Sequence, residues 1–421
     1  MTRILVLTNM YPPHHLGGYE LSCRDVVERM RAHGHEITVL TTTMRLPGVD
    51  DAPDERAGGI LRDLAFYWDD HRIVNPSIPG RIGLERRNQR ALQDALERAR
   101  PDVVSAWNMG AMSLGLLTTV LERDLPVVLN VCDEWPVYGP TVDAWSRPLV
   151  RRPVLARVVR RLTGLPAAPP DLGERAVFLF ISDMIRRRVE ERSPWKPRTW
   201  SIVYNGIDRR DFPPAPDEER PWRWQLLYAG RIDERKGIHI AVEALRALPP
   251  EATLEIDGRG DDTYLRRLRD LVARLGLGDR VRFAASTRTA LRERYRAADA
   301  VVFPTLWAEP FGLVPVEAMS CRTPVVATGT GGSGEFLLDQ INCIIVPPGD
   351  PEALAAAVRR LAGDAGLRAR LVERGLETAD ILDVEHFAEV TEAWHVAVAE
   401  RFRHGRPGDR PSPVAGFASA S

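Results

Sequence analysis

Two glutamates in the second half of the chain have the type and spacing of a ligand-binding pair. Glu309 and Glu317 stand eight positions apart within residues 306–320, LWAEPFGLVPVEAMS. The apolar run before them, residues 300–303, predicts a short buried strand, and Pro315 suits the first turn of a helix, where its missing N–H costs nothing. The expected order is strand, loop and helix, with Glu309 in the loop and Glu317 in the first helical turn.

The backbone between these glutamates favours an anion. Gly312 lets the main chain approach a ligand closely, and the N–H groups at a helix start attract phosphate. Carboxylates beside such a site can accept hydrogen bonds from hydroxyl groups of the same ligand, which indicates a phosphate that carries sugars. The alternative is that Glu317 only complements the helix dipole while Glu309 is solvated, because the spacing alone is weak evidence.

A second loop brings two cations to the end of a strand. Residues 225–229 predict a strand, residues 230–237 (GRIDERKG) a loop, and residues 238–248 a helix. Arg231 and Lys236 flank this loop, and paired cations there suit a diphosphate. The chain has only two lysines, and one of them is Lys236, which favours a function over a solvated surface charge.

The N-terminal segment predicts a βαβ unit that opens with a glycine pair. Gly17 and Gly18 lie between a predicted strand at residues 4–8 and a predicted helix at residues 19–32. They could bring the backbone to a phosphate, although a tight turn without a ligand explains them equally well. The spacing is not G-x-G-x-x-G, so a dinucleotide-binding dehydrogenase is disfavoured.

An acidic and aromatic cluster follows the predicted strand at residues 127–129. In a parallel sheet, ligands gather beyond the carboxyl ends of the strands, which makes Asp133 and Trp135 candidates for an acceptor site. Asp133 as a simple loop cap is the alternative. Tyr138 and Trp145 lie close in the sequence, and such rings could stack on a sugar or a small aglycone.

Residues 147–161 contain six arginines and no acidic residue, with valines and leucines between them. A basic amphipathic helix of this kind is typical of contact with an anionic membrane or an anionic acceptor. A surface helix packed through its valine and leucine face is the alternative, and is somewhat favoured.

The length and composition of the chain indicate which class of protein it belongs to. A chain of 421 residues with 44% hydrophobic content predicts two ordinary globular domains, and a net charge of −1 gives no sign of a nucleic-acid partner. The four cysteines form no Cys-x-x-Cys pair, so neither a zinc site nor a disulfide framework is indicated. Free thiols, and the lack of a signal-peptide or membrane-spanning run, predict a cytoplasmic protein, with peripheral membrane contact through residues 147–161 as an option.

Strands and helices alternate twice along the chain, which predicts an α/β fold with two Rossmann-like domains and a binding cleft between them. The first domain is expected at residues 1–205 and the second at residues 210–385, separated by an Asn-Gly turn and a Pro-rich stretch. Residues 386–403 predict the last helix. The tail at 405–421 is rich in Pro, Gly, Ala and Ser and is expected to be disordered.

Several of these motifs recur together in a known family. They are Gly17-Gly18-Tyr19-Glu20, Asn205-Gly206-Ile207-Asp208, Gly230-Arg231, Lys236-Gly237, the stretch from Glu309 to Glu317, Gly331-Gly332 with Glu335, and Val346-Pro347-Pro348-Gly349-Asp350. In their order and spacing they resemble family 4 of the glycosyltransferases, which has the GT-B fold, over nearly the whole chain.

The resemblance implies a bacterial enzyme that moves a hexosyl group from a nucleotide-diphosphate sugar, UDP- or GDP-linked, to an acceptor hydroxyl with retention of configuration. The second domain would bind the donor, the first domain would bind the acceptor, and the final helix would cross back to the first domain. The residues that would hold the donor are Arg231 and Lys236 (diphosphate), Glu309 with the backbone at Phe311, Gly312 and Leu313 (sugar), Glu317 (ribose), and Gly17 and Gly18 (phosphates).

No Asp-x-Asp motif is present, so neither a metal-bound donor nor a cofactor is expected. Arg231, Lys236 and a helix N-terminus can stabilise the leaving diphosphate instead. With no obvious enzyme nucleophile, front-face displacement is favoured, and double displacement through Glu309 is the alternative.

Two positions depart from the family pattern. Cys132 stands where family members often have histidine, so Asp133 is left as the residue that could orient the acceptor, whether glycan, lipid-linked molecule or natural product. Asn342-Cys343 replaces a usual glycine turn and is expected to be structural. A sugar-nucleotide 2-epimerase of the same fold and a non-catalytic nucleotide-sugar binding protein remain as alternatives.

Overall fold

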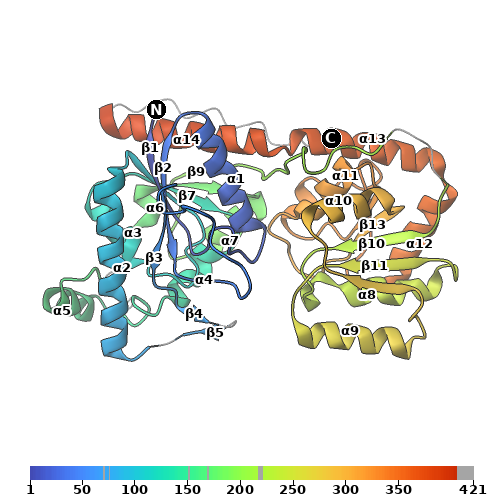
Figure 1. Ribbon diagram of the computed structural model, residues 1–421, viewed down its shortest axis with the longest axis horizontal. Helices are drawn as coiled ribbons and strands as arrows, with labels where there is room; N and C mark the ends of the chain where they lie inside the picture. Colours follow the sequence, from blue (N-terminus) through green and yellow to red (C-terminus); the bar gives the residue numbers. More distant parts are fainter. Residues whose placement is uncertain (70–71, 75, 150–151, 168–169, 217–220, 405–421) are drawn as a thin grey trace. The chain divides into compact units, whose positions relative to one another are not determined.

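The computed structural model describes residues 1–69, 72–74, 76–149, 152–167, 170–216 and 221–404. The chain divides into two compact units (Figure 1). The first contains Met1–Tyr204 and the final helix from Phe387 on, and the second contains Asn205–His386. The expected disordered tail, 405–421, lies outside the described residues.

The first unit is built on a seven-stranded sheet with the order β3-β2-β1-β6-β7-β8-β9, and all of its strand pairs are parallel. Its strands are β1 (Arg3–Leu7), β2 (Glu36–Thr42), β3 (Ile60–Leu64), β6 (Val103–Ala106), β7 (Val127–Val131), β8 (Ala176–Phe180) and β9 (Thr199–Ile202), and a separate hairpin joins β4 (Trp68–Asp69) to β5 (Arg72–Ile73).

Helices connect and cover these strands, as parallel pairing requires. They are α1 (Gly18–Ala32), α2 (Ile78–Ala99), α3 (Gly115–Glu122), α4 (Trp135–Val142), α5 (Pro153–Thr163), α6 (Leu172–Arg175), α7 (Asp183–Arg192) and the last helix α14 (Val384–His404). Glu392 of α14 accepts hydrogen bonds from His33 (2.6 Å) and His35 (2.9 Å) beside α1. These contacts hold the C-terminal helix on the first unit.

The second unit has a six-stranded parallel sheet with the order β12-β11-β10-β13-β14-β15. Its elements are β10 (Gln225–Ala229), η1 (Glu234–Lys236), α8 (Ile238–Ala244), η2 (Leu245–Ala247), β11 (Thr253–Asp257), α9 (Asp262–Arg274), β12 (Val281–Ala284), α10 (Arg288–Ala297), β13 (Ala300–Phe303), α11 (Leu313–Ser320), β14 (Val325–Ala327), η3 (Gly332–Glu335), β15 (Ile344–Ile345), α12 (Pro351–Gly363) and α13 (Ala365–Ile381). The predicted α/β class is therefore confirmed.

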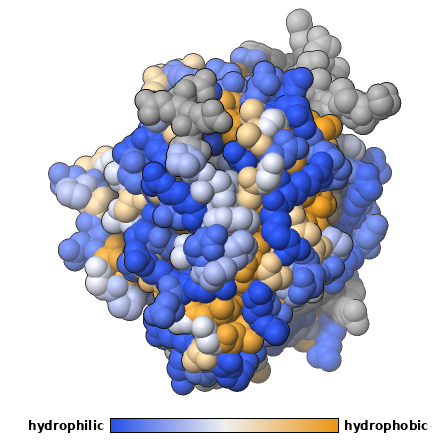
Figure 2. Space-filling model, turned by 90° about the vertical axis from the view of Figure 1, so that its right-hand side faces the viewer, coloured by the Kyte–Doolittle hydropathy of each residue, from blue (hydrophilic) through white to orange (hydrophobic). Residues whose placement is uncertain are grey.

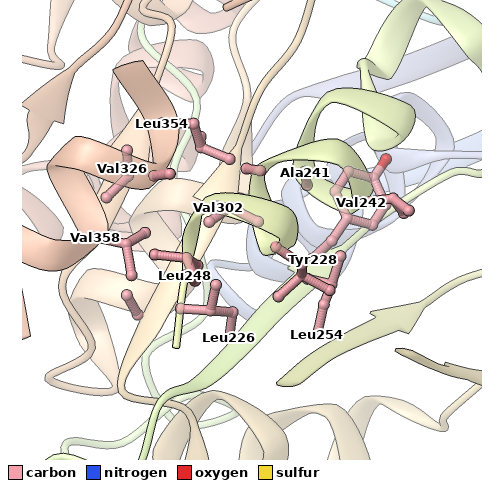
Figure 3. Close-up of a cluster of buried hydrophobic side chains, with 14 of the residues drawn as sticks. Leu226, Tyr228, Ala241, Val242, Leu248, Leu254, Val302, Val326, Leu354 and Val358 are labelled. Atoms are coloured by element: carbon pink, nitrogen blue, oxygen red, sulfur yellow. The ribbon is translucent and has the colours of Figure 1, made fainter. Parts of the chain in front are cut away.

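The core of the second unit lies between this sheet and two of its helices (Figure 3). Leu226 and Val302 extend from β10 and β13, and they meet Val242 of α8 and Val358 of α12. Complete burial of one such side chain is worth about 1.5–3 kcal/mol, so this core fixes the strand ends from which the site loops begin. Hydrophilic side chains predominate on the face drawn in Figure 2. None of the described helices has the length and apolar character needed to cross a membrane.

Candidate active site

Three loops of the second unit meet at the carboxyl edge of its sheet. They follow β10, β13 and β14, which are neighbours in the sheet. The amide of Leu306 donates to the carbonyl of Arg235 (2.8 Å), and the amide of Gly332 donates to the carbonyl of Glu309 (2.7 Å). The loops are thus joined to one another by their own backbones.

Two glycines make this close approach possible. Gly237 has φ 66°, and a Cβ there would lie 2.0 Å from the carbonyl oxygen of Pro304. Gly331 has φ 73°, and a Cβ there would lie 2.6 Å from backbone atoms of Glu309. Any larger residue would push the loops apart, so these positions fix where Glu309 stands.

The carboxylate of Glu309 is held by two donors. Lys236 Nζ lies 2.6 Å from Glu309 Oε2, and the indole N–H of Trp307 donates to the same oxygen at 2.8 Å. Among the described residues no group donates to Glu309 Oε1. With its side chain only 12% exposed, Glu309 presents an oriented carboxylate oxygen that can accept a hydrogen bond from a ligand hydroxyl.

The cations of the first loop are arranged around the same indole. The guanidinium of Arg235 lies 4.6 Å from the ring centroid of Trp307 and is paired with Asp233 at 2.6 Å. Lys236 Nζ is 5.7 Å from that ring. Arg231 is the second residue after β10 and is exposed. The sequence singled out Arg231 and Lys236 but missed Trp307 and Arg235, and the signal was a tryptophan two residues before Glu309.

The sequence predicted Glu317 in the first turn of its helix, and this prediction is wrong. Helix α11 begins at Leu313, because Gly312 takes φ 96° and ends the loop earlier than Pro315 suggested. Glu317 is thus the fifth helical residue. The hydroxyl of the fully buried Tyr295 donates to its Oε2 at 2.7 Å, and burial raises the pKa of Glu317.

The other predicted sugar contacts offer backbone rather than side chains. Phe311 is 2% exposed, and its ring lies 4.9 Å from that of Phe336. Its side chain is therefore part of the core. Gly312 is the N-cap residue of α11 and Leu313 its first residue, so the helix begins directly after the loop that carries Glu309.

In the first unit, Asp133 of the loop after β7 meets Tyr138 of α4. The hydroxyl of Tyr138 donates to Asp133 Oδ2 at 2.9 Å, and the amide of Trp135 donates to Oδ1 at 2.8 Å. Burial raises the pKa of Asp133 to about 6, while these two hydrogen bonds oppose the rise. The pair also includes an accessible group, because Tyr138 is 36% exposed.

The predicted stacking role of Trp135 and Trp145 is wrong for this conformation. Trp135 is fully buried, and its ring lies 6.3 Å from that of Trp195. Trp145 is 5% exposed and donates its indole N–H to the carbonyl of Pro166 at 2.6 Å. Both rings are packed in the interior, whereas Tyr138 of α4 is exposed enough to touch a ligand.

Cys132 and the glycine pair are also occupied locally. Cys132 is 8% exposed, its amide donates to the hydroxyl of Tyr19 at 3.2 Å, and burial raises the pKa of its thiol. The amide of Gly17 donates to the carboxylate of Glu20 at 2.9 Å, and Gly18 is the first residue of α1. Gly17 therefore closes a helix cap here, and its amide would have to exchange partners to meet a phosphate.

Asn342 has the structural role expected of it. Its side chain accepts from the amide of Leu338 (2.8 Å) and donates to the carbonyl of Phe336 (2.7 Å) and the hydroxyl of Thr378 (2.9 Å). Cys343 beside it is buried.

Two family models cover most of the chain. The model described as Glycosyltransferase Family 4 matches residues 16–211, and the model described as Glycosyl transferases group 1 matches residues 213–378. Among curated relatives, the glycogen synthase of Mycobacterium tuberculosis is 28% identical over 96% of this chain and 97% of its own length. The D-inositol 3-phosphate glycosyltransferase of Xylanimonas cellulosilytica is 42% identical over 54% of this chain and 61% of its own.

Solved structures agree on the fold. HepE from Anabaena, in complex with UDP and glucose, superimposes with a TM-score of 0.68 at 21% identity and covers 93% of this chain and 99% of that one. Sucrose-phosphate synthase from Thermosynechococcus elongatus gives a TM-score of 0.70 at 22% identity, with coverage of 93% and 98%. The resemblance inferred from the motifs is confirmed: the chain belongs to family 4 of the glycosyltransferases and has the GT-B fold.

Proposed function

We propose that this glycosyltransferase moves a hexosyl group from a nucleotide-diphosphate sugar to an acceptor hydroxyl with retention of configuration. The observation that carries the proposal is the geometry of Glu309. Its Oε2 is fixed by Lys236 and Trp307, and its Oε1 is left for a sugar hydroxyl. A cation at 2.6 Å from the same carboxylate suits a donor in which sugar and diphosphate are adjacent.

The remaining donor contacts follow from this arrangement. Lys236 and the exposed Arg231 bind the diphosphate as charge-assisted partners. The backbone at Phe311, Gly312 and Leu313 faces the sugar, and Glu317 accepts from the ribose hydroxyls.

The transfer step proceeds on one face of the sugar. The bond between the anomeric carbon and the diphosphate oxygen breaks, the acceptor oxygen bonds to that carbon, and the acceptor's proton passes to a donor phosphate oxygen. Lys236 and Arg231 stabilise the charge that develops on the leaving diphosphate without a metal ion. Glu309 is a poor nucleophile, because an ammonium and an indole N–H both stabilise its negative charge. This disfavours a double displacement.

The acceptor is oriented by Asp133 and Tyr138 of the first unit. With a pKa of about 6, Asp133 is mostly ionised at neutral pH and can accept a hydrogen bond from an acceptor hydroxyl. Glycans, lipid-linked acceptors and natural products all carry such hydroxyls. The relatives named glycogen synthase and D-inositol 3-phosphate glycosyltransferase give glucan and inositol phosphate priority in an acceptor screen.

Calorimetry with a panel of nucleotide diphosphates and their sugars, in a chelator and without metal, tests the donor site. UDP-linked sugars come first, because HepE was solved with UDP-glucose. Lys236→Ala is expected to weaken binding roughly tenfold to a hundredfold, the worth of a charged hydrogen bond. Lys196→Ala, which removes the other lysine from an exposed position, is the matched control and should bind like wild type.

Glu309→Gln tests the sugar contact. It should bind the free nucleotide diphosphate normally and lose transfer, because the amide nitrogen cannot accept a hydrogen bond. Wild-type turnover to an epimerised nucleotide sugar without acceptor would identify a 2-epimerase instead. Tight binding with no turnover across the acceptor screen would favour a non-catalytic binding protein, and a strict need for added metal would overturn the metal-free mechanism.

A further inference from the structure

Helix α5 exposes its aliphatic side chains. Figure 1 shows α5 at the periphery of the first unit. Four of its larger apolar residues reach solvent: Val154 (64% exposed), Leu155 (41%), Val158 (47%) and Leu162 (79%). An ordinary surface helix buries such residues and exposes polar ones, so the packed valine and leucine face favoured from the sequence is not what the structure has.

The periodicity of the helix explains this inversion. Residues 154, 158 and 162 are four apart and form one row along the helix, beside Leu155. The side that faces the protein includes Ala156, which is 5% exposed, and Val159, both packed near Leu149 and Ala167. The helix is therefore attached through small contacts while its larger apolar row stays uncovered.

Two exposed arginines flank this row. From Asp143, which is fully buried, to Asp171 the sequence contains six arginines and no acidic residue. Arg157 and Arg161 are exposed and each lies three residues after a member of the row. Arg160 instead pairs with Glu122 of α3 and thereby holds α5 against α3.

We propose that α5 docks on an anionic lipid bilayer, with this apolar row in the acyl boundary and Arg157 and Arg161 on headgroup phosphates. An anionic bilayer offers both an apolar layer and negative charge at the depth of a helix radius. A second copy of the chain would bring two sets of arginines together, and a nucleic acid would leave the aliphatic row uncovered. The proposal does not depend on the transfer reaction, since binding is measured without donor or acceptor.

Vesicle flotation of the full chain tests it. Wild type is expected to float with vesicles that contain about 30% phosphatidylglycerol in about 0.1 M salt, to stay behind with pure phosphatidylcholine, and to release as salt shortens the screening length. Arg157→Gln with Arg161→Gln should weaken binding roughly twenty-five-fold, at about fivefold per arginine. Leu162→Ser should weaken it roughly tenfold by removing buried apolar area.

Ile381→Ser is the matched control, because Ile381 is 55% exposed on a helix of the second unit. It should float like wild type, and far-UV circular dichroism should show all variants folded. No flotation of wild type, or equal flotation of wild type and the α5 variants, would overturn the proposal. A wild-type dimer in light scattering that Leu162→Ser converts to a monomer would assign the helix to a second copy instead.

Discussion

Trp307 is the residue that links the cationic loop to Glu309. Its indole N–H donates to the same carboxylate oxygen of Glu309 as Lys236 does. The centroid of its ring lies 4.6 Å from the guanidinium of Arg235. Trp307→Phe removes the N–H donor and keeps an aromatic ring, although a smaller one. We expect kcat/KM for the donor sugar to fall about tenfold, the worth of a hydrogen bond to a charged group, with little change in affinity for the free nucleotide diphosphate.

The second unit provides a matched control for this substitution. The guanidinium of Arg368 lies 5.5 Å from the ring centroid of Trp222. The buried indole nitrogen of Trp222 has no hydrogen-bond partner among the residues that the structure describes. Trp222→Phe should therefore leave donor kinetics unchanged. Equal kinetics for Trp307→Phe and wild type would mean that Lys236 alone orients Glu309.

Asp133 predicts a pH dependence of acceptor use. Burial raises its pKa to about 6, and the ionised carboxylate accepts a hydrogen bond from an acceptor hydroxyl more strongly than the protonated acid does. At saturating donor, kcat/KM for the acceptor should rise with pH and level off above about 6. Asp133→Asn should remove this limb. Tyr138→Phe should move it to higher pH, because the hydroxyl of Tyr138 stabilises the carboxylate. A limb that persists in Asp133→Asn would belong to another group.

For single residues, the sequence predicted the chemical type of the site's side chains better than the direction in which each side chain points. Glu309 and Lys236 were predicted separately, and the structure joins them at 2.6 Å. Trp135 was predicted to face a ligand, yet it is fully buried, since proximity to a strand end does not say which way a ring turns. Trp307 lay inside the motif, but its role needs the loop geometry that two glycines impose.

Among the elements, apolar runs predicted strands well and turn chemistry predicted helix starts less well. The structure has β10 and β13 at the residues expected, because short buried runs of valine, leucine and alanine leave little freedom. Helix α11 starts two residues before Pro315, since the positive φ of Gly312 sets the boundary. Helix α5 has the predicted apolar period, but its larger apolar side chains face solvent and not the protein. Periodicity identifies an apolar face of a helix and does not say what covers it.

Helix α2 carries a buried acid that should make stability depend on pH. Glu85 is fully buried, accepts from Gln89 at 2.8 Å, and has a pKa raised by burial from its ordinary 4.5 to about 7. Glu85 ionises near pH 4.5 in the unfolded chain and near pH 7 in the folded one. Its contribution to the free energy of unfolding is therefore fully present below pH 4.5 and is lost as the pH rises to 7. At about 1.4 kcal/mol per pH unit the loss is about 3 kcal/mol.

Urea unfolding from pH 4.5 to 8 measures this loss. Glu85→Gln, which stays neutral, should match wild type at low pH and exceed its free energy of unfolding by up to about 3 kcal/mol at pH 8. Glu97→Gln, on the exposed side of the same helix, should follow the wild-type curve. The buried Asp143, whose pKa is raised in the same direction, should leave a residual slope in both variants. A Glu85→Gln curve parallel to wild type would refute the assignment.

For the whole molecule, the division into two units predicts how a nucleotide diphosphate affects unfolding. Each unit has its own parallel sheet, and every donor contact proposed for a charged side chain lies in the second. A ligand at a hundredfold excess over its Kd adds about 2.7 kcal/mol to the unit that binds it. For a domain of this size that raises the unfolding temperature by about 5–10 °C.

Leu354→Ala identifies the transition of the second unit in a calorimetric scan. Leu354 is buried in that core, 1% exposed, so its truncation should cost about 2–5 kcal/mol and lower one transition. The nucleotide diphosphate should raise that same transition in wild type and leave the other in place, and Lys236→Ala should abolish the rise. If the nucleotide instead raises the transition that Leu354→Ala leaves unmoved, the donor belongs to the first unit, and the roles assigned to Glu309, Lys236 and Glu317 fail together.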